Sequence, residues 1–270
     1  MDGFREFLSL GRWELSPESW GIFCLAVFIV GFSKTGLPGA SILAVPLMAM
    51  VFPPKASVGL ALPVYMMADV LSVWKYRRFT KWRYCFPYLL FVGLGVWSAS
   101  FVAGSVDDRT FGVIIGWTVT ALVLLSAGTD FLQKRKMEKR EKHPLSAEPA
   151  EVPPLAMSAF FGSAAGLVSA LANAGSPVMG IYMIMARLDK FHILGTTAVC
   201  AFLMNWLKVP LFLSLNMLSV ETLKLDIAVI PVIVAGGLAG VAFAKKLPQK
   251  AFRKLVLVSA LAAAVKLILS

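Results

Sequence analysis

The stretch GFSKTGLPGA, residues 31–40, interrupts a run of apolar residues that would otherwise cross a membrane. WGIFCLAVFIV precedes it and SILAVPLMAM follows it. The stretch holds three glycines, a proline, two hydroxyl residues and one lysine. Unpaired backbone groups and a charge are costly in hydrocarbon unless they face protein or a water-filled cavity. The stretch therefore predicts a broken membrane helix with a positive charge at the break.

The composition of the whole chain supports a membrane location. Of its 270 residues, 58% are hydrophobic and only 15% are charged, whereas a soluble domain carries about 25% charged residues. The apolar residues form continuous blocks of roughly 15–22, which as helices cross about 30 Å of hydrocarbon. A transmembrane β-barrel would show alternating polarity instead. We therefore predict an all-α integral membrane protein.

The net charge of +11 would also suit nucleic-acid binding, but its placement favours a membrane topology. The basic residues gather in three short segments, 75–83, 134–142 and 245–254. Cytoplasmic loops are enriched in lysine and arginine, and one topology of about ten segments places all three inside and both termini outside. We expect no nucleic-acid partner, and no cleavable secretory signal at the N-terminus.

Apolar blocks, prolines and glycines give the expected helices. Ser16 and Pro17 are typical of a helix start. We predict helices at 17–32, 36–52, 57–74, 84–104, 109–128, 155–172, 176–187, 191–216, 226–244 and 250–269. The segment 176–187 is short for a full crossing. A charged linker, 129–153, separates an N-terminal membrane repeat (1–128) from a C-terminal one (154–270), and we expect it to be flexible and cytoplasmic.

The two halves share a weak internal repeat. KTGLPGASILAVPLM resembles ANAGSPVMGIYMIM, which pairs Gly36 with Gly175. VGLALPVYMMADVL resembles LGTTAVCAFLMNWL, which pairs Asp69 with Asn205. Five segments per half give the second half the opposite orientation. The sequence thus predicts two inverted five-segment repeats with broken helices.

Matching helix breaks near the midplane of a membrane suit an anion, because half-helix N-termini offer backbone N–H groups and the positive end of the helix dipole. The predicted substrate-binding residues at the breaks are Ser33, Lys34, Thr35, Gly36 and Gly39 in the first half, and Asn173, Gly175 and Ser176 in the second. The alternatives are close helix packing at the glycines, and Lys34 as a loop residue at the cytoplasmic end of the first helix.

Three more polar residues, Asp69, Asn205 and Lys208, lie within apolar helices and complete the predicted site. An ionisable residue at membrane depth costs about 2.5–3.5 kcal/mol, so it usually serves a function or is paired. Asp69 could take a proton, which would make H⁺ the coupling ion, or it could form a structural ion pair. Lys208 could contact an anion or snorkel from a helix end. Asn205 lies on the face of Lys208.

The polar residues offer no sign of an enzyme. Cys24, Cys85 and Cys200 are scattered without a CxxC pair, and the two histidines form no cluster. We therefore predict no metal site and no cofactor. A nucleophile–base pair is missing as well, and so is a P-loop for ATP-driven transport.

At these residues the chain resembles the sulfite exporter TauE/SafE family of membrane proteins. The resemblance rests on GFSKTGLPGA, NAGSPVMGIYMI and GTTAVCAFLMNWLKVPLF and runs from about residue 20 to residue 269. It implies a multi-pass carrier in the bacterial inner membrane that exports sulfite, sulfonates or related small anions. The residues themselves favour a small anion without singling out sulfur. A carrier for small carboxylates and an anion channel are therefore the alternatives.

Overall fold

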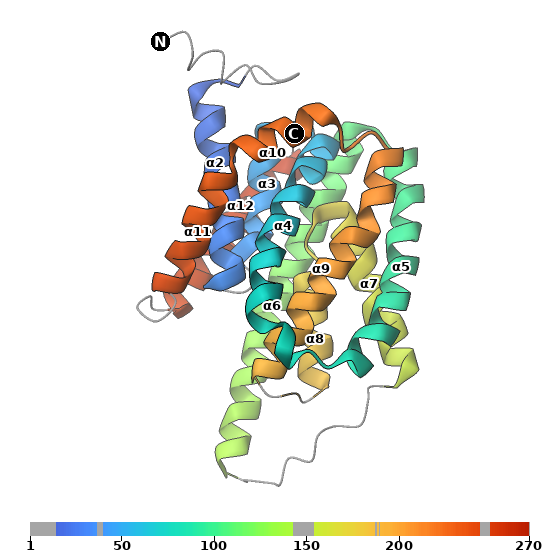
Figure 1. Cartoon of the computed structure of the whole chain (residues 1–270), viewed down its shortest axis with the longest axis vertical. Helices are drawn as coiled ribbons and strands as arrows, with labels where there is room; N and C mark the ends of the chain where they lie inside the picture. The colour runs from blue at the N-terminus through green and yellow to red at the C-terminus, as the bar shows by residue number, and fades with distance from the viewer. Residues whose placement is uncertain are drawn as a thin grey trace.

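The computed structural model describes residues 15–36, 40–142, 154–186, 188, 190–243 and 249–269. This part of the chain is helical, with eleven α-helices and two short 3-10 helices (Figure 1). The first half contains α2 (Pro17–Thr35), η1 (Ala40–Leu43), α3 (Ala44–Met48), α4 (Pro54–Tyr76), η2 (Arg77–Phe79), α5 (Trp82–Ser105) and α6 (Asp108–Lys142). The second half contains α7 (Leu155–Ala172), α8 (Ser176–Met185), α9 (Lys190–Ser214), α10 (Val220–Ala228), α11 (Ile230–Phe243) and α12 (Gln249–Leu269). The predicted all-α class is confirmed.

Six helices of the described part are long and apolar enough to cross a membrane. A seventh span arises if α10 and α11, which meet at a bend of 49°, are counted together. Two of the other predicted segments correspond to shorter pieces, namely η1 with α3, and α8. The last corresponds to α12, whose apolar part is Leu257–Leu269. Ser16 caps the first helix as predicted, because its side chain accepts a hydrogen bond from the backbone N–H of Ser19 at 3.2 Å.

Two of the differences between the predicted and the observed helices lie next to prolines. A helix over 36–52 would place Pro46 in its interior, where it lacks the N–H of the ladder. The chain instead forms η1 and restarts as the five-residue α3, which has Pro46 in its first turn. The segment predicted at 226–244 begins at Val220 and breaks at Val229, just before Pro231, for the same reason. Helix α6 continues through Lys142, so the first part of the predicted linker is helical.

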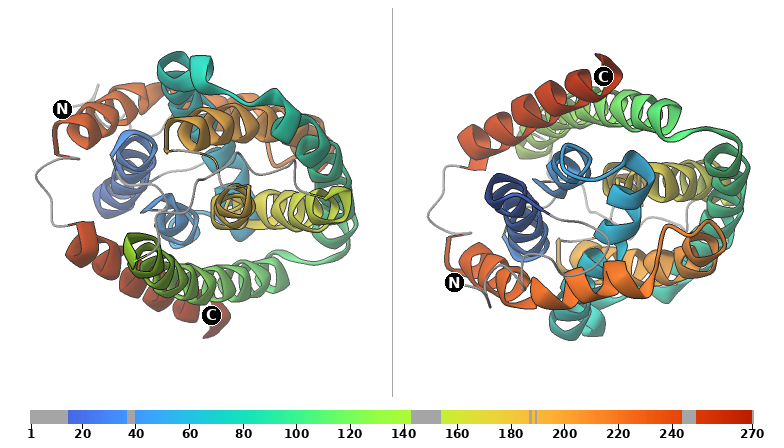
Figure 2. Two further views of the ribbon diagram at one scale, coloured as in Figure 1. Left: turned by 90° about the horizontal axis from the view of Figure 1, so that it is seen from below. Right: turned by 90° about the horizontal axis from the view of Figure 1, so that it is seen from above.

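The helices pack in pairs that join the two halves. Helix α2 packs against α11, α5 against α7, α6 against α12, and α4 against α9. Both end-on views show α6 and α12 side by side along one edge, with α11 along the opposite edge (Figure 2). Each pair takes one helix from each half, so the folded unit depends on both.

Glycines allow the α2–α11 and α5–α7 pairs to approach closely. A Cβ atom on Gly31 would overlap the carbonyl oxygen of Ile233, and one on Gly236 would overlap that of Phe28. In the other pair, a Cβ on Gly95 would overlap the carbonyl oxygen of Ser163. Such small residues are typical of membrane helix interfaces, where backbones pack directly together.

Substituting Gly31 by alanine is therefore expected to separate α2 from α11 and to cost about 1–3 kcal/mol of stability, as overpacking does in other cores. Gly21 offers a control in the same helix, because nothing lies within 4 Å of a Cβ placed there. Gly21→Ala should be neutral or stabilising by up to about 1 kcal/mol. Thermal unfolding in detergent, followed by tryptophan fluorescence, compares the two variants. Equal melting temperatures would contradict the close-packing argument.

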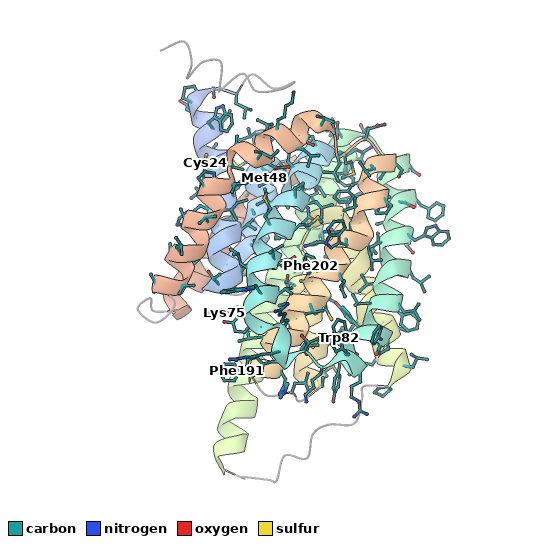
Figure 3. The ribbon with its side chains drawn as sticks, viewed as in Figure 1. Cys24, Met48, Lys75, Trp82, Phe191 and Phe202 are labelled. Carbon is teal, nitrogen blue, oxygen red and sulfur yellow. The ribbon has the colours of Figure 1, made fainter. Side chains whose placement is uncertain are left out.

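The described elements that contain basic residues of these segments lie toward one end of the molecule. Helices α4 and α6 run downward in Figure 1 and α12 runs upward, so η2, the end of α6 and the start of α12 lie toward the lower end. Figure 3 shows Lys75, Trp82 and Phe191 in this lower part of the molecule. The start of α2 and the end of α12 lie toward the upper end in Figure 1. A single orientation in the membrane can therefore place η2, the end of α6 and the start of α12 on one side.

Candidate functional site

Five polar side chains meet inside the helical bundle and form what we call the polar cluster. They come from α2, α4, α9 and the end of α7 and are Lys34, Asp69, Asn173, Asn205 and Lys208. Asp69 and Lys208 are completely buried, and Asn173 and Asn205 are buried as well. The Lys34 side chain retains 14% of its exposure. All five are residues that the sequence predicts for the site.

Asp69 lies at the centre of one part of the polar cluster. One carboxylate oxygen forms an ion pair with the Lys34 ammonium group. The other accepts a hydrogen bond from Asn205 Nδ2 at 2.6 Å. Lys34 Nζ also lies 5.5 Å from the centre of the Tyr65 ring, within the range of a cation–π contact. The structural ion pair considered for Asp69 is thus present, with Lys34 as the partner.

Lys208 occupies the other part of the polar cluster. Its ammonium group donates to Asn173 Oδ1 and to the backbone carbonyl of Ser169, the latter at 3.3 Å. It also lies 5.8 Å from the centre of the Phe212 ring. A snorkelling lysine would reach water, whereas this side chain has no exposure. The snorkelling alternative for Lys208 is therefore wrong.

Asn173 is held in place by the way α7 ends. It adopts a left-handed conformation with φ 49°, which suits asparagine at a helix C-terminus. Its Nδ2 donates to the carbonyl oxygen of Val58 on α4 at 2.7 Å, while its Oδ1 accepts from Lys208. The side chain thus links α7, α4 and α9. Pro177 follows in the first turn of α8, where it needs no hydrogen bond.

The first helix break is stabilised from both sides. Ser33 Oγ accepts a hydrogen bond from the backbone N–H of Ser41 at 3.1 Å. Tyr65 OH donates to the Ser41 carbonyl at 2.7 Å, and Ser72 Oγ contacts the Lys34 carbonyl at 3.4 Å. Ser33 therefore connects the end of α2 to η1 across the break.

The other predicted residues of the breaks contact neighbouring helices instead of the polar cluster. Thr35 Oγ1 donates to the carbonyl of Gly237 on α11 at 2.7 Å. A Cβ on Gly36 would lie 2.8 Å from the Cα of Gly240, and one on Gly175 would lie 2.9 Å from the carbonyl oxygen of Ala165. Ser176 is the first residue of α8 and is half-buried. Gly39 lies outside the described residues.

Sequence reasoning missed one buried acidic residue. Asp226, in α10, is 1% exposed, and neither carboxylate oxygen has a hydrogen-bond partner among the described residues. The available signal was an acidic side chain in the apolar segment LDIAVIP, directly before the helix-breaking proline. The sequence also could not predict that the backbone carbonyls of Val58 and Ser169 accept hydrogen bonds from Asn173 and Lys208, because no sequence pattern reveals such contacts.

The charges of the polar cluster do not cancel. It contains two ammonium groups, from Lys34 and Lys208, and a single carboxylate, from Asp69. In their usual ionisation states these groups carry one net positive charge within a buried, poorly hydrated region. Such a region attracts an anion, because a buried charge without a partner is unfavourable.

A comparison with known families identifies the chain. The family model for the sulfite exporter TauE/SafE family matches residues 23–267, which include the whole polar cluster. This protein belongs to the sulfite exporter TauE/SafE family. It is accordingly a multi-pass membrane transporter and not an enzyme, with six or seven candidate spans in its described part. No curated protein and no solved structure matches the chain significantly.

Proposed function

We propose that this protein is a secondary carrier that exports sulfite or an organosulfonate across the bacterial inner membrane, with the anion bound at the polar cluster. The observation that carries the proposal is that two lysine side chains, Lys34 and Lys208, are buried together in the interior with a single carboxylate, Asp69. Membership of the sulfite exporter family supports a small sulfur anion as the substrate.

The helix pairing supports two inverted repeats. Exchanging the halves would place α2 on α7, α3 on α8, α4 on α9, α5 on α10 with α11, and α6 on α12. The α2–α11 pair then becomes the α7–α5 pair, and both are close, glycine-lined contacts. The α4–α9 and α6–α12 pairs map onto themselves, as helices next to a two-fold axis should. Inverted repeats of this kind transport by rocking one part against the other around a central site.

The contacts of the polar cluster also support two related halves. In each half a lysine contact joins the broken helix to the long helix that follows it, through Lys34–Asp69 in the first half and Asn173–Lys208 in the second. The Asn205–Asp69 hydrogen bond joins the two halves. A rocking motion would change these contacts, so binding at this position can be coupled to access from either side. We place the lower, basic end of the molecule in the cytoplasm.

Lys208 is the best candidate for direct contact with the anion. An ammonium group has three N–H donors, and protein contacts account for two of them. The N-terminus of α8 adds the positive end of a helix dipole near Asn173. Charge-assisted hydrogen bonds contribute about 1.5–3 kcal/mol each, enough to select a small oxyanion.

Burial supports a carrier over a channel. Asp69 and Lys208 are buried in this conformation. A conducting channel keeps a continuous path for its ion, whereas a carrier passes through states in which the site is closed. Counterflow in proteoliposomes distinguishes the two, because only a carrier accelerates uptake when unlabelled anion is present on the opposite side.

A thermal-shift screen of the purified protein tests the substrate class. At a hundredfold excess over its dissociation constant, a ligand stabilises the folded state by about 2.7 kcal/mol. For a chain of this size, that corresponds to a rise of roughly 5–10 °C in melting temperature. We expect this rise with sulfite, taurine or sulfoacetate, and none with chloride. A rise with small carboxylates alone would show a carboxylate carrier and overturn the sulfur assignment.

A further inference from the structure

Asp226 is a buried acidic side chain with no hydrogen-bond or ion-pair partner in the described part of the chain. It is 1% exposed, and both carboxylate oxygens lack hydrogen bonds. A charged carboxylate in such surroundings is very unfavourable, whereas an uncharged carboxylic acid is tolerated far better. The geometry therefore suits a side chain that has its proton bound in this conformation.

The elements around Asp226 supply little charge to stabilise a carboxylate. Helix α10 packs against α4 and α11. Helix α11 contains no titratable residue. The other charged residues of α10 are Glu221 and Lys224, and the Lys224 side chain is exposed to the outside of the bundle.

The titratable residues of α4 are Lys55, Tyr65, Asp69, Lys75 and Tyr76, and none forms a hydrogen bond to Asp226. Lys55 Nζ donates to the carbonyl oxygen of Val106 at 2.6 Å, and Tyr65 OH donates to Ser41. Asp69 belongs to the polar cluster. Lys75 and Tyr76 end α4 in the lower part of the molecule, whereas α10 lies at the upper end (Figures 1 and 3).

Helix α10 is a short helix with a defined start and a defined end. A capping box between Ser219 and Thr222 closes its start. Its end is the 49° bend at Val229, followed by Pro231, which cannot continue the hydrogen-bond ladder. Asp226 lies in the last turn of this nine-residue helix, three residues before the bend.

We propose that Asp226 is a proton-binding site that couples anion transport to pH, an inference that rests on the carrier function proposed above. A proton associates with the carboxylate from the upper, non-basic side, and the neutral side chain is buried in the conformation described here. Release of the proton leaves a carboxylate that draws α10 toward water.

The contacts of α4 connect Asp226 to the polar cluster. Helix α10 packs on α4, and a Cβ on Gly59 of α4 would overlap the carbonyl oxygen of Met217, just before α10. The adjacent residue, Val58, accepts the hydrogen bond from Asn173. A displacement of α10 therefore acts on the helix that carries Asp69 and that accepts the hydrogen bond from Asn173.

Asp69, which the sequence suggests as the proton carrier, is less suited to that role. Both of its oxygens have donors, the Lys34 ammonium group and the Asn205 amide. Donors of this kind stabilise the charged carboxylate. Asp226 has neither donor, so it gains from holding a proton.

Infrared spectroscopy of the full-length protein tests the protonation directly, without any substrate. Over about pH 7–9 ordinary carboxyl groups are ionised, so a carbonyl stretch of a carboxylic acid reports an unusual one. We expect this band in the wild type, its loss in Asp226→Asn, and its presence in the control Asp69→Asn. A wild-type spectrum without the band would overturn the proposal, whether or not the variants fold.

Transport of methanesulfonate into proteoliposomes tests the coupling, because the charge of this probe is constant over the same pH range. One coupled proton changes the wild-type rate by up to tenfold per pH unit, whereas Asp226→Asn should give a pH-independent rate. Equal pH profiles of the two proteins would overturn the coupling. If the wild type transports no anion but shows the infrared band, the carrier proposal fails and the proton site stands. If instead the wild type transports the anion in a way that depends on Lys34 or Lys208 but shows no infrared band, the carrier proposal stands and the proton site at Asp226 fails.

Discussion

Lys34→Met is expected to destabilise the folded protein by about 3–5 kcal/mol, the usual cost of removing one partner of a buried ion pair. The variant leaves Asp69 without its cation, and the Asp69 side chain is only 1% exposed. The hydrogen bond from Asn205 remains, but a single amide donor cannot replace an ammonium charge. Thermal unfolding in detergent, followed by tryptophan fluorescence, measures the loss.

The double variant Lys34→Met with Asp69→Asn is the matched control. It removes both charges, and replacing a buried ion pair by uncharged side chains is often neutral. We therefore expect its melting temperature to return close to that of the wild type. The interaction energy follows from the two single variants and the double one. Additive losses would mean that the Lys34–Asp69 pair contributes nothing to the folded state.

The same double variant separates two roles of Lys34. It leaves the polar cluster with Lys208 as its remaining charge, so the net charge stays at one positive unit. If Lys34 only neutralises Asp69, anion affinity should change little. If Lys34 contacts the anion, affinity should fall although stability is restored.

Most of the polar cluster could be predicted from the sequence, because charged and amide residues are conspicuous in apolar segments. Lys34, Asp69, Asn173, Asn205 and Lys208 all stand out for this reason. Their partners could not be predicted. Which lysine pairs with Asp69 depends on the packing of α2 against α4, and Lys208 is held by the carbonyl of Ser169 on another helix.

Residues with a packing role were harder to separate from residues of the site. Thr35 and Gly36 lie in the same motif as Lys34, yet they contact α11, from the other half of the chain. Sequence spacing shows which residues lie near the break, but not which side each one faces after the helix ends. Gly36 thus matches the alternative of close helix packing.

The fold was predicted best where segments are long and continuous. The breaks at Pro46 and Pro231 were visible in the sequence, but apolar content outweighed them in the predicted helices 36–52 and 226–244. The predicted helix 226–244 also placed Asp226 at a helix start, where acidic side chains are common and favourable. Its burial was therefore not predicted. Its burial arises from α10, whose earlier start at Val220 places this residue in the last turn.

Lys208→Met is expected to lower anion affinity tenfold to a hundredfold, because it removes one charge-assisted hydrogen bond of about 1.5–3 kcal/mol. The variant also takes the net charge of the polar cluster from plus one to zero. Methionine retains the length and apolar stem of lysine, so the space next to Phe212 stays filled. Calorimetric titration with sulfite and with sulfoacetate measures the affinity.

The variant also leaves the Asn173 amide oxygen and the Ser169 carbonyl without their donor, which costs about 1–3 kcal/mol of stability. The size-exclusion profile must therefore show that it is folded before its affinity is interpreted. Lys266→Met is the control, since it makes the same chemical change at an exposed position of α12 and should bind like the wild type. A well-folded Lys208→Met variant with wild-type affinity would remove this lysine from the site. The anion would then be held by helix dipoles and by Lys34, and the buried Lys208 would serve only to join α9 to α7.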